Sequence, residues 1–433
     1  MKKLTVLLGL SLIVFSTASF AQVSQDELQL LRQQVELLTN RLDQLEEQNK
    51  QLVETIEQSN ASAVAQTEAV VEARVDEAVA EQVAEQVGEK MAAVSWAERI
   101  RWSGDLRYRY ENIDYEHKDD RNRSRIRART HLEADLMPTL KVGFGLSTGG
   151  DDPVSGNVTL GGGGSKKDIK LDLAYFDWSG LQDTHIVGGK FKNFLVRPAK
   201  TGLQWDGDWR PEGLGVVWNN DTIFVNALGT WLEGDSKNGT SFAWVAQAGV
   251  NLKVGETGKL KIGGGYSEFD IAGLDPVYGD PENFYGNSFV RNPVTGELVY
   301  KYDYHVFEGF AEYSFKLGGQ SMLLFADYTH NADADDNDTG YLFGFTYGST
   351  KKQGDWAFTY FYEKLEADAV VGLLTDSDFG DGGTNAKGSV FSGSYAFSSN
   401  WNVKASYFLN QILLDTEVPQ DYNRLQLDLN FKF

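Results

Sequence analysis

The chain has 433 residues, a formal net charge of −22 and no cysteine. The acidic charge argues against nucleic acid as a partner. The lack of cysteine excludes disulfides, thiolate zinc sites and a cysteine nucleophile. Hydrophobic residues make up only 41% of the chain, yet aromatic residues reach 12% and glycine is abundant. This combination is typical of a barrel whose strands are apolar on one face only.

The first 21 residues have the pattern of a secretory signal peptide. Lys2 and Lys3 are basic, residues 4–15 are apolar, and small residues precede an expected cleavage after Ala21. The apolar run is too short for a membrane-spanning helix, and no later run reaches about 20 apolar residues. We therefore expect a secreted chain, and any membrane-spanning part of it must be a closed barrel.

Residues 22–95 are expected to form an α-helical coiled-coil stalk. Apolar residues recur at heptad positions a and d for about four heptads, and the polar a residue Asn49 is of the kind that fixes register. Beyond residue 61, valines recur every four residues, which predicts a looser or right-handed continuation. A lone amphipathic surface helix is the alternative. The heptad residues are Leu28, Leu31, Val35, Leu38, Leu42, Leu45, Asn49, Leu52 and Ile56.

Residues 96–433 are expected to form an all-β, antiparallel transmembrane barrel. The segment Tyr422–Phe433 places leucine and phenylalanine on one face of a strand and polar residues on the other, up to the C-terminal Phe433. Sixteen such segments, give or take two, can be placed along the chain. Short and long connections alternate between them; the longest is expected at about 270–301, and another loop is expected at 367–386. The last strand is expected to pair with the first and close the barrel.

Seven arginines fall on the polar face of the first two expected strands, about 100–112 and 122–136. If the hairpin turns near residue 116, Arg101 comes level with His131 or Glu133, and most of the other arginines come level with one another. Guanidinium groups stay charged, so this cluster needs counter-charge from passing anions or from carboxylates. The predicted pore-lining residues are Arg101, Arg107, Arg109, Arg123, Arg125, Arg127 and Arg129.

The layout resembles the putative-porin family of Gram-negative outer membranes. The matching features are the signal peptide, the coiled coil, the first strand at Ile100–Tyr110, the segment 189–193, the loop 205–213 and the terminal Phe433. The plan of stalk and barrel is also similar to that of phosphate-selective porins. The resemblance implies passive diffusion of small hydrophilic solutes, a periplasmic stalk and, as is usual for porins, a homotrimer.

In general porins the third outer loop folds inward and narrows the pore, and the resemblance implies the same for the connection 193–212. An arginine wall opposite an acidic loop would set up a transverse field that orders polar solutes. Static ion pairs that only stiffen the wall are the alternative interpretation. The predicted constriction residues are Arg197, Lys200, Asp206, Asp208, Arg210 and Glu212.

The sequence shows no catalytic, metal or cofactor motif. Aspartates between 333 and 338 resemble part of a calcium loop, but its glycine and final glutamate are misplaced. We expect instead a solvated acidic loop, bridged by divalent ions to lipopolysaccharide. The segment 161–166 lacks the Lys-Ser or Lys-Thr ending of a phosphate-binding loop, and the five histidines are scattered.

Three functions are compatible with a signal peptide, a coiled-coil stalk and an outer-membrane barrel. A diffusion porin in contact with outer-membrane lipid is the leading hypothesis. A barrel that anchors the outer membrane to peptidoglycan through the stalk is the second, and a barrel filled by its own loops would favour it. A barrel enzyme is the third, but it needs a nucleophile and a base that converge, and no Ser–His arrangement stands out. The arginines favour anions and the net charge favours cations, so ion preference stays open.

Overall fold

The computed structural model describes residues 99–234, 241–276 and 278–433, and scattered residues between 36 and 59, of which 50–57 are helical. The chain divides into two compact units, Met1–Ala93 and Val94–Phe433. The signal peptide and most of the expected coiled coil lie outside the described residues. Within the described part, no helix combines the length and the hydropathy needed to cross a membrane.

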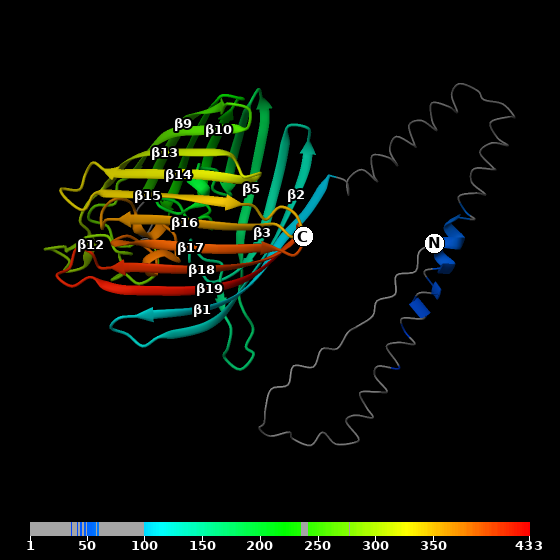
Figure 1. Ribbon diagram of the computed structural model, residues 1–433, viewed down its shortest axis with the longest axis horizontal. Helices are drawn as coiled ribbons and strands as arrows, with labels where there is room; N and C mark the ends of the chain where they lie inside the picture. The colour runs from blue at the N-terminus through cyan, green and yellow to red at the C-terminus, as the bar shows by residue number, and fades with distance from the viewer. Residues whose placement is uncertain are drawn as a thin grey trace, which may run out of the picture. The chain divides into compact units, whose positions relative to one another are not determined.

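The second unit is a closed antiparallel barrel of sixteen strands, which confirms the predicted fold class (Figure 1). Closure is direct, because β1 pairs with β2 on one side and with β19 on the other. The wall consists of β1 (Ile100–Tyr115), β2 (Arg121–Met137), β3 (Leu140–Thr148), β5 (Ile169–Leu181), β6 (Thr184–Lys190), β7 (Glu212–Asn219), β8 (Ile223–Glu233), β9 (Ser241–Val254), β10 (Gly258–Phe269), β13 (Tyr304–Leu317), β14 (Gln320–Asn331), β15 (Thr339–Gly348), β16 (Trp356–Leu365), β17 (Ala386–Ala396), β18 (Trp401–Ile412) and β19 (Gln420–Lys432).

Three short strands lie outside this wall. The two-residue β4 (Val158–Thr159) pairs with β2 at Ile126 and extends the sheet beyond the end of β3. The hairpin of β11 (Phe289–Arg291) and β12 (Leu298–Tyr300) forms a separate two-stranded sheet within the longest loop.

Burial along β19 shows which way the strand faces point. Leu427 and Leu429 are 43% and 36% exposed, whereas Gln426 and Asp428 are 3% and 4% exposed. A soluble sheet would bury its leucines against a core. Here the apolar face points outward and the polar face points into the lumen, as in transmembrane barrels.

The two ends of the barrel differ. At one end, here called the terminal end, β1 begins and β19 ends, and the connections between strands are tight turns such as Gly318-Gly319. The ring of Phe433 contacts Trp102 with centroids 5.6 Å apart, and its carbonyl accepts a hydrogen bond of 2.9 Å from the Gly104 amide. The other end, here called the loop end, carries the long connections.

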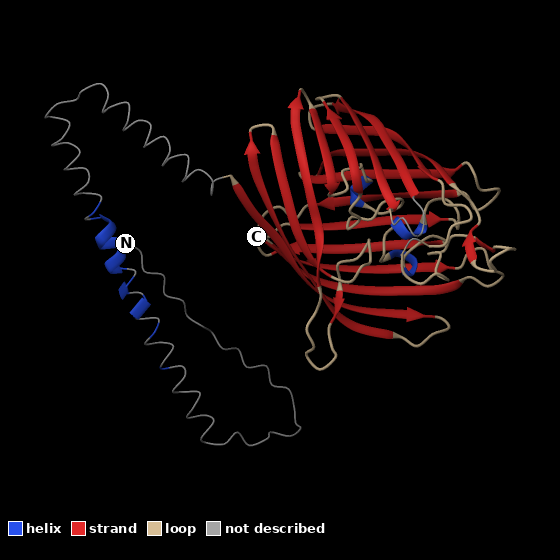
Figure 2. Ribbon diagram, turned by 180° about the vertical axis from the view of Figure 1, so that it is seen from behind, coloured by secondary structure: helices blue, strands red, loops and turns tan. Residues whose placement is uncertain are grey.

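Three long connections fold into the lumen from the loop end. They span 191–211, 270–303 and 366–385, close to the expected bounds, and carry the short helical turns η1 (Pro198–Lys200), η2 (Gly372–Leu374) and η3 (Phe379–Asp381). Figure 2 shows these turns inside the ring of strands. The sequence predicts an inward fold for the first of these loops only. The lumen therefore contains a loop core as well as a wall.

Apolar side chains from these loops pack on one another and on the inner wall. Such residues include Leu203 and Trp205 from the first loop, Phe284 from the second and Leu373 from the third. The buried side chain of Asn287 connects the last two, because its amide donates to the carbonyls of Ala367 (2.7 Å) and Val370 (2.8 Å) and its oxygen accepts from Gly372 N (2.8 Å). Buried apolar area and satisfied polar groups thus hold the loops inside the barrel.

Candidate functional site

The first hairpin carries the arginine wall. In the register of β1 with β2, Arg107 lies opposite Arg127, Arg109 opposite Arg125, and Arg101 opposite Glu133. All of these side chains share the lumenal face, because alternate residues of a strand point the same way. Like charges that face one another across a sheet are unfavourable unless other groups neutralise them.

Carboxylates from the wall and from a loop neutralise the part of this wall nearest the terminal end. Asp105, on β1, accepts from Arg127 at 3.1 Å and from Arg129 at 2.8 Å. Asp208, from loop 191–211, accepts from the same two guanidinium groups at 2.9 and 2.7 Å. The predicted loop and the predicted wall are therefore in direct contact at this point, through charge-assisted hydrogen bonds.

A second set of ion pairs lies nearer the loop end and includes residues that the sequence analysis did not single out. Glu111, fully buried, bonds Arg123 and Arg424, the latter at 2.5 Å, and lies 3.8 Å from Arg125. Asp378, from loop 366–385, bonds Arg109 at 2.7 Å and Arg424 at 2.8 Å. Asp428 on β19 holds Arg109 through both of its oxygens, at 2.7 and 2.9 Å.

Arg101 and Arg107 differ from the other arginines. Arg101 pairs with Asp135 at 2.5 Å near the terminal end, and its side chain is 47% exposed. Arg107 donates to Asn157 Oδ1 at 2.5 Å and, among the described residues, has no ion pair with a carboxylate; its buried Nε has no hydrogen-bond partner. Arg107 is therefore a guanidinium with unused donors on the lumenal face.

The structure brings together some of the predicted constriction residues. Arg210 bonds Asp172 at 3.2 Å and lies 4.0 Å from Asp208. Arg197 points at the backbone carbonyl of Trp205, at 3.4 Å. Asp206 links the loop to loop 366–385, since its backbone amide donates to the carbonyl of Leu374 (2.7 Å) and its carboxylate accepts from the Ser377 amide (3.3 Å).

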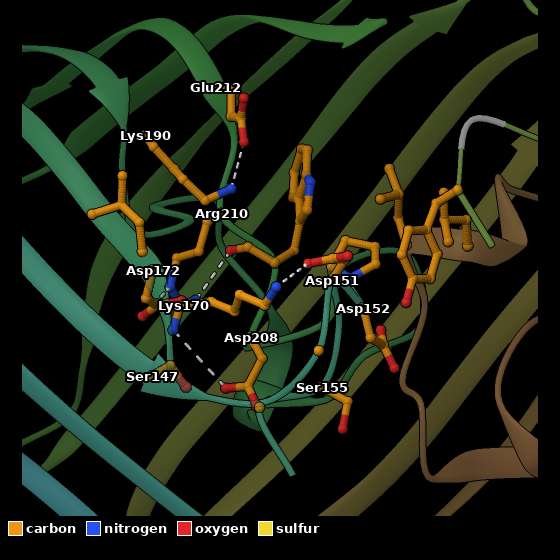
Figure 3. A pocket seen from close by; sticks show the side chains of 18 of the residues that line it. Ser147, Asp151, Asp152, Ser155, Lys170, Asp172, Lys190, Asp208, Arg210 and Glu212 are labelled. Atoms are coloured by element: carbon orange, nitrogen blue, oxygen red, sulfur yellow. Dashed lines mark hydrogen bonds and ion pairs between the residues drawn. The ribbon is translucent and has the colours of Figure 1, made fainter. Parts of the chain in front are cut away.

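Glu212 does not join this set. It begins β7, on the same face as the outward-pointing Leu214, and pairs with Lys190 at 2.5 Å across the β6–β7 ladder. The sequence analysis counted Glu212 with the loop because alternation cannot show where a loop ends and a strand begins. Its carboxylate is drawn at the edge of the loop-end cavity in Figure 3.

Two cavities approach each other at the arginine wall. The larger, of about 910 Å³, opens toward the terminal end and is lined there by Lys432 and Phe433. The other, of about 670 Å³, lies toward the loop end beside Asp151 and Lys170 (Figure 3). The linings of the two cavities share Arg129, Asp172, Asp208 and Arg210. These four residues, here called the charged neck, mark the junction of the two spaces.

The loop carboxylates around the neck differ in pKa. Burial alone would raise the pKa of Asp208, but Arg127, Arg129 and Arg210 outweigh burial and lower it to about 2. Burial and the neighbouring Asp376 raise the pKa of Asp206 well above its usual value. Asp208 thus carries a fixed negative charge, whereas Asp206 takes up a proton far more readily.

The described residues also contain one group of side chains with metal-ligand character, Glu268, Asp270 and His305. The ring of His305 lies 3.2 Å from Asp270 and 3.2 Å from Asp333 at its two nitrogens. The sequence analysis did not connect these residues, because strand pairing brings together positions that are far apart in the chain. This group lies at the loop end, apart from the charged neck.

Comparison with known proteins places the fold among outer-membrane porins. OprB of Pseudomonas putida, in its high-pH structure, aligns with a TM-score of 0.53 at 14% identity, over 79% of this chain and 96% of that chain. Salmonella typhi OmpF in complex with daunomycin aligns with a TM-score of 0.45 at 12% identity, over 77% of this chain and 97% of that chain. The likeness to OprB shows a shared fold. No curated protein matches the chain.

The sequence itself matches a family. The profile of the family described as putative porin covers residues 114–277 and 290–433, which together make up more than half of the chain. These segments hold most of the barrel, including the charged neck. The chain therefore belongs to the putative porin family.

Proposed function

We propose that this protein is a diffusion porin that lets small hydrophilic solutes or ions cross the Gram-negative outer membrane through its lumen, beside the arginine wall. One observation carries the proposal: in a closed barrel with a polar interior, two cavities of about 910 and 670 Å³ share the four residues of the charged neck. Residues of opposite charge in a narrow passage order polar solutes and repel apolar ones. Membership of the porin family supports the same function.

The test is planar-bilayer recording of the purified, folded protein under a KCl gradient. We expect discrete conductance steps and a measurable reversal potential. A heat-resistant folded barrel that produces no steps would contradict the porin function. Recording from two preparations, one refolded and one extracted from membranes, excludes a refolding defect as the cause of silence.

The proposal extends to location and assembly. Residues 22–95 would stand in the periplasm as a coiled-coil stalk, because they precede the terminal end of the barrel. A helix with one apolar seam needs partner helices, so the stalk favours self-association, and we propose a homotrimer. The outward apolar face would contact outer-membrane lipid, and the acidic loops at the loop end would meet lipopolysaccharide.

A second candidate function is that of an anchor between the outer membrane and peptidoglycan. The inward fold of three loops favours it, because their apolar core occupies lumenal space. The porin function accounts better for the described lumen, because an anchor has no need of charged cavities on both sides of a neck. Removal of residues 22–95 distinguishes the two, because only an anchor needs the stalk for its function.

A further inference from the structure

The larger cavity has an excess of cationic side chains that are not neutralised. Besides the ion-paired arginines, its lining contains Arg107, Lys192, Arg197, Lys200 and Lys404. Within the described part of the chain, none of these five forms an ion pair with a carboxylate. Arg107 and Arg197 bond only uncharged groups, and the side chains of the three lysines have no hydrogen-bond partner.

The carboxylates of the same cavity are, in contrast, largely committed. Asp105 and Asp208 each bond two arginines, and Asp172 bonds Arg210. Asp378 bonds Arg109 and Arg424 as described above. The two exceptions, Asp206 and Asp376, lie side by side on the two loops and accept hydrogen bonds from backbone amides.

The pKa of each of these two aspartates is raised above its usual value. Burial, together with the neighbouring Asp376 and Asp208, raises the pKa of Asp206, and burial together with Asp378 raises that of Asp376. Free positive charge in the cavity therefore exceeds free negative charge. Desolvation and the neighbouring Arg210 lower the pKa of Lys192, as expected where the local potential is positive.

Three of the free cations gather at one place. A third cavity, of about 330 Å³, lies between loop 191–211, loop 366–385 and the wall strands β15 to β19. Its lining shares the cations Arg107, Lys200 and Lys404 with the larger cavity, together with Asp376, Asp378 and Asn430. Asp378 and Asp428, which also line it, are ion-paired with Arg109, so Asp376 is the carboxylate of this lining, within the described residues, that no ion pair neutralises. The three cations come from β1, from the turn η1 and from β18, so the closure of the barrel and the inward loop together assemble the cluster.

We propose that Arg107, Lys200 and Lys404 form a binding site for a small oxyanion that passes through the lumen. The Nη groups of the Arg107 guanidinium, of which one bonds Asn157, can donate to the oxygens of a carboxylate or phosphate, and the two ammonium groups supply further donors. The third cavity, of about 330 Å³, has ample room for an anion of a few heavy atoms. This inference rests on the proposed porin function and names its solute class.

The experiment uses the full-length protein and the double variant Lys200→Gln with Lys404→Gln. The matched control is Lys351→Gln with Lys352→Gln, which removes the same charge from an exposed turn outside the lumen. Reversal potentials are measured in KCl gradients, and inorganic phosphate and acetate are then titrated against the chloride current. Calorimetric titration of phosphate into detergent-solubilised protein measures binding without conduction.

We expect anion preference and a phosphate-dependent decrease of chloride current in the wild type and the control. In the double variant, the chloride-to-potassium permeability ratio and the apparent phosphate affinity should both fall at least about threefold. A decrease caused by acetate as well would assign the site to oxyanions in general, whereas a decrease caused by phosphate alone would narrow it to phosphate.

Two results would overturn the inference. A cation-selective wild type, or a double variant that behaves like the control, would leave the porin function standing and remove the oxyanion site. If the wild type does not conduct, the porin function fails. The phosphate affinity measured by calorimetry, compared between the wild type and the double variant, then tests the oxyanion site independently of conduction. If the double variant does not show the heat-resistant migration of a folded barrel, the same measurements are made on the single variant Lys200→Gln, which changes only a loop residue.

Discussion

Individual charges in the lumen are placed by strand alternation, but their partners come from elsewhere in the chain. Arg127 and Arg129 point inward because they alternate with outward-facing residues of β2. Asp208, which neutralises both, lies about eighty residues later, on a loop whose inward path is set by packing. A lumenal arginine can thus be recognised in the sequence, whereas its ion pair cannot.

At the charged neck, Asp208→Asn removes the carboxylate that three arginines share. Since the pKa of Asp208 is about 2, the change subtracts one full negative charge at neutral pH and also at pH 4. We expect the chloride-to-potassium permeability ratio to rise about two- to fivefold at both pH values, because the Asp208 side chain is only 20% exposed and solvent screens its charge weakly. Reversal potentials in a KCl gradient measure this ratio.

The matched control for that variant is Asp151→Asn, which makes the same charge change in the loop-end cavity. The Asp151 side chain is 77% exposed and pairs only with Lys170, so solvent screens it. An Asp208→Asn channel with the permeability ratio of this control would show that the neck does not govern passage.

Among the elements, the inward loops have the largest influence on the space available for solutes. Loop 191–211 presents Asp208 to the wall, and loop 366–385 presents Asp378 to Arg109 and Arg424. The hydrogen bonds of Asn287 attach the second of these to loop 270–303. The loops therefore behave as one packed unit, and loosening one contact should widen the passage.

Asn287→Ala tests this coupling. The variant leaves the carbonyl of Val370 and the amide of Gly372 without their partner, at a cost of about 1–3 kcal/mol for each buried group that stays unsatisfied. The carbonyl of Ala367 still accepts from the Thr384 hydroxyl. We expect larger, noisier conductance and faster cleavage by thermolysin within 366–385, with the barrel still heat-resistant. Single-channel recording and limited proteolysis measure the two effects.

The exposed Asn283→Ala is the control for the same loop, since that side chain bonds only the nearby Tyr285 amide. Equal cleavage and conductance in Asn287→Ala and Asn283→Ala would mean that the loops stay in place without this contact. A variant without a folded barrel would instead place Asn287 among the residues needed for folding.

For the whole molecule, removal of residues 22–95 separates the porin from the anchor. A porin without its stalk should keep its single-channel conductance, because the lumen is built from the barrel unit alone. An anchor without its stalk should leave the envelope leaky to detergents and dyes. The stalk also decides assembly in our proposal, so the mass of the detergent-solubilised complex should change from a trimer to a smaller species.

Asn49→Leu is the control variant for that deletion, because it keeps the stalk and changes only the residue expected to fix its register. If the deletion abolishes conductance while the barrel remains folded, this would contradict the expectation that the barrel alone forms the conducting pathway. A full-length complex of the mass of one chain would contradict the trimer.

The sequence by itself determined the barrel, because alternation is a local property. Each wall strand alternates over its own length, and tight turns separate the strands, so strand number, closure and the lumenal face of each arginine could be predicted without knowledge of distant contacts. Closure also placed β19 beside β1. Arg424 and Asp428 on its polar face could have been recognised as partners of the arginine wall for that reason.

Only the tertiary structure decided what fills the lumen. The inward paths of loops 270–303 and 366–385 depend on apolar packing between segments far apart in the chain, which leaves no periodic signal. The same packing brings Asp378 to Arg109 and leaves Arg107, Lys200 and Lys404 without carboxylate partners. Which charges are neutralised and which stay free is a property of long-range contact, and that balance determines the solute we expect.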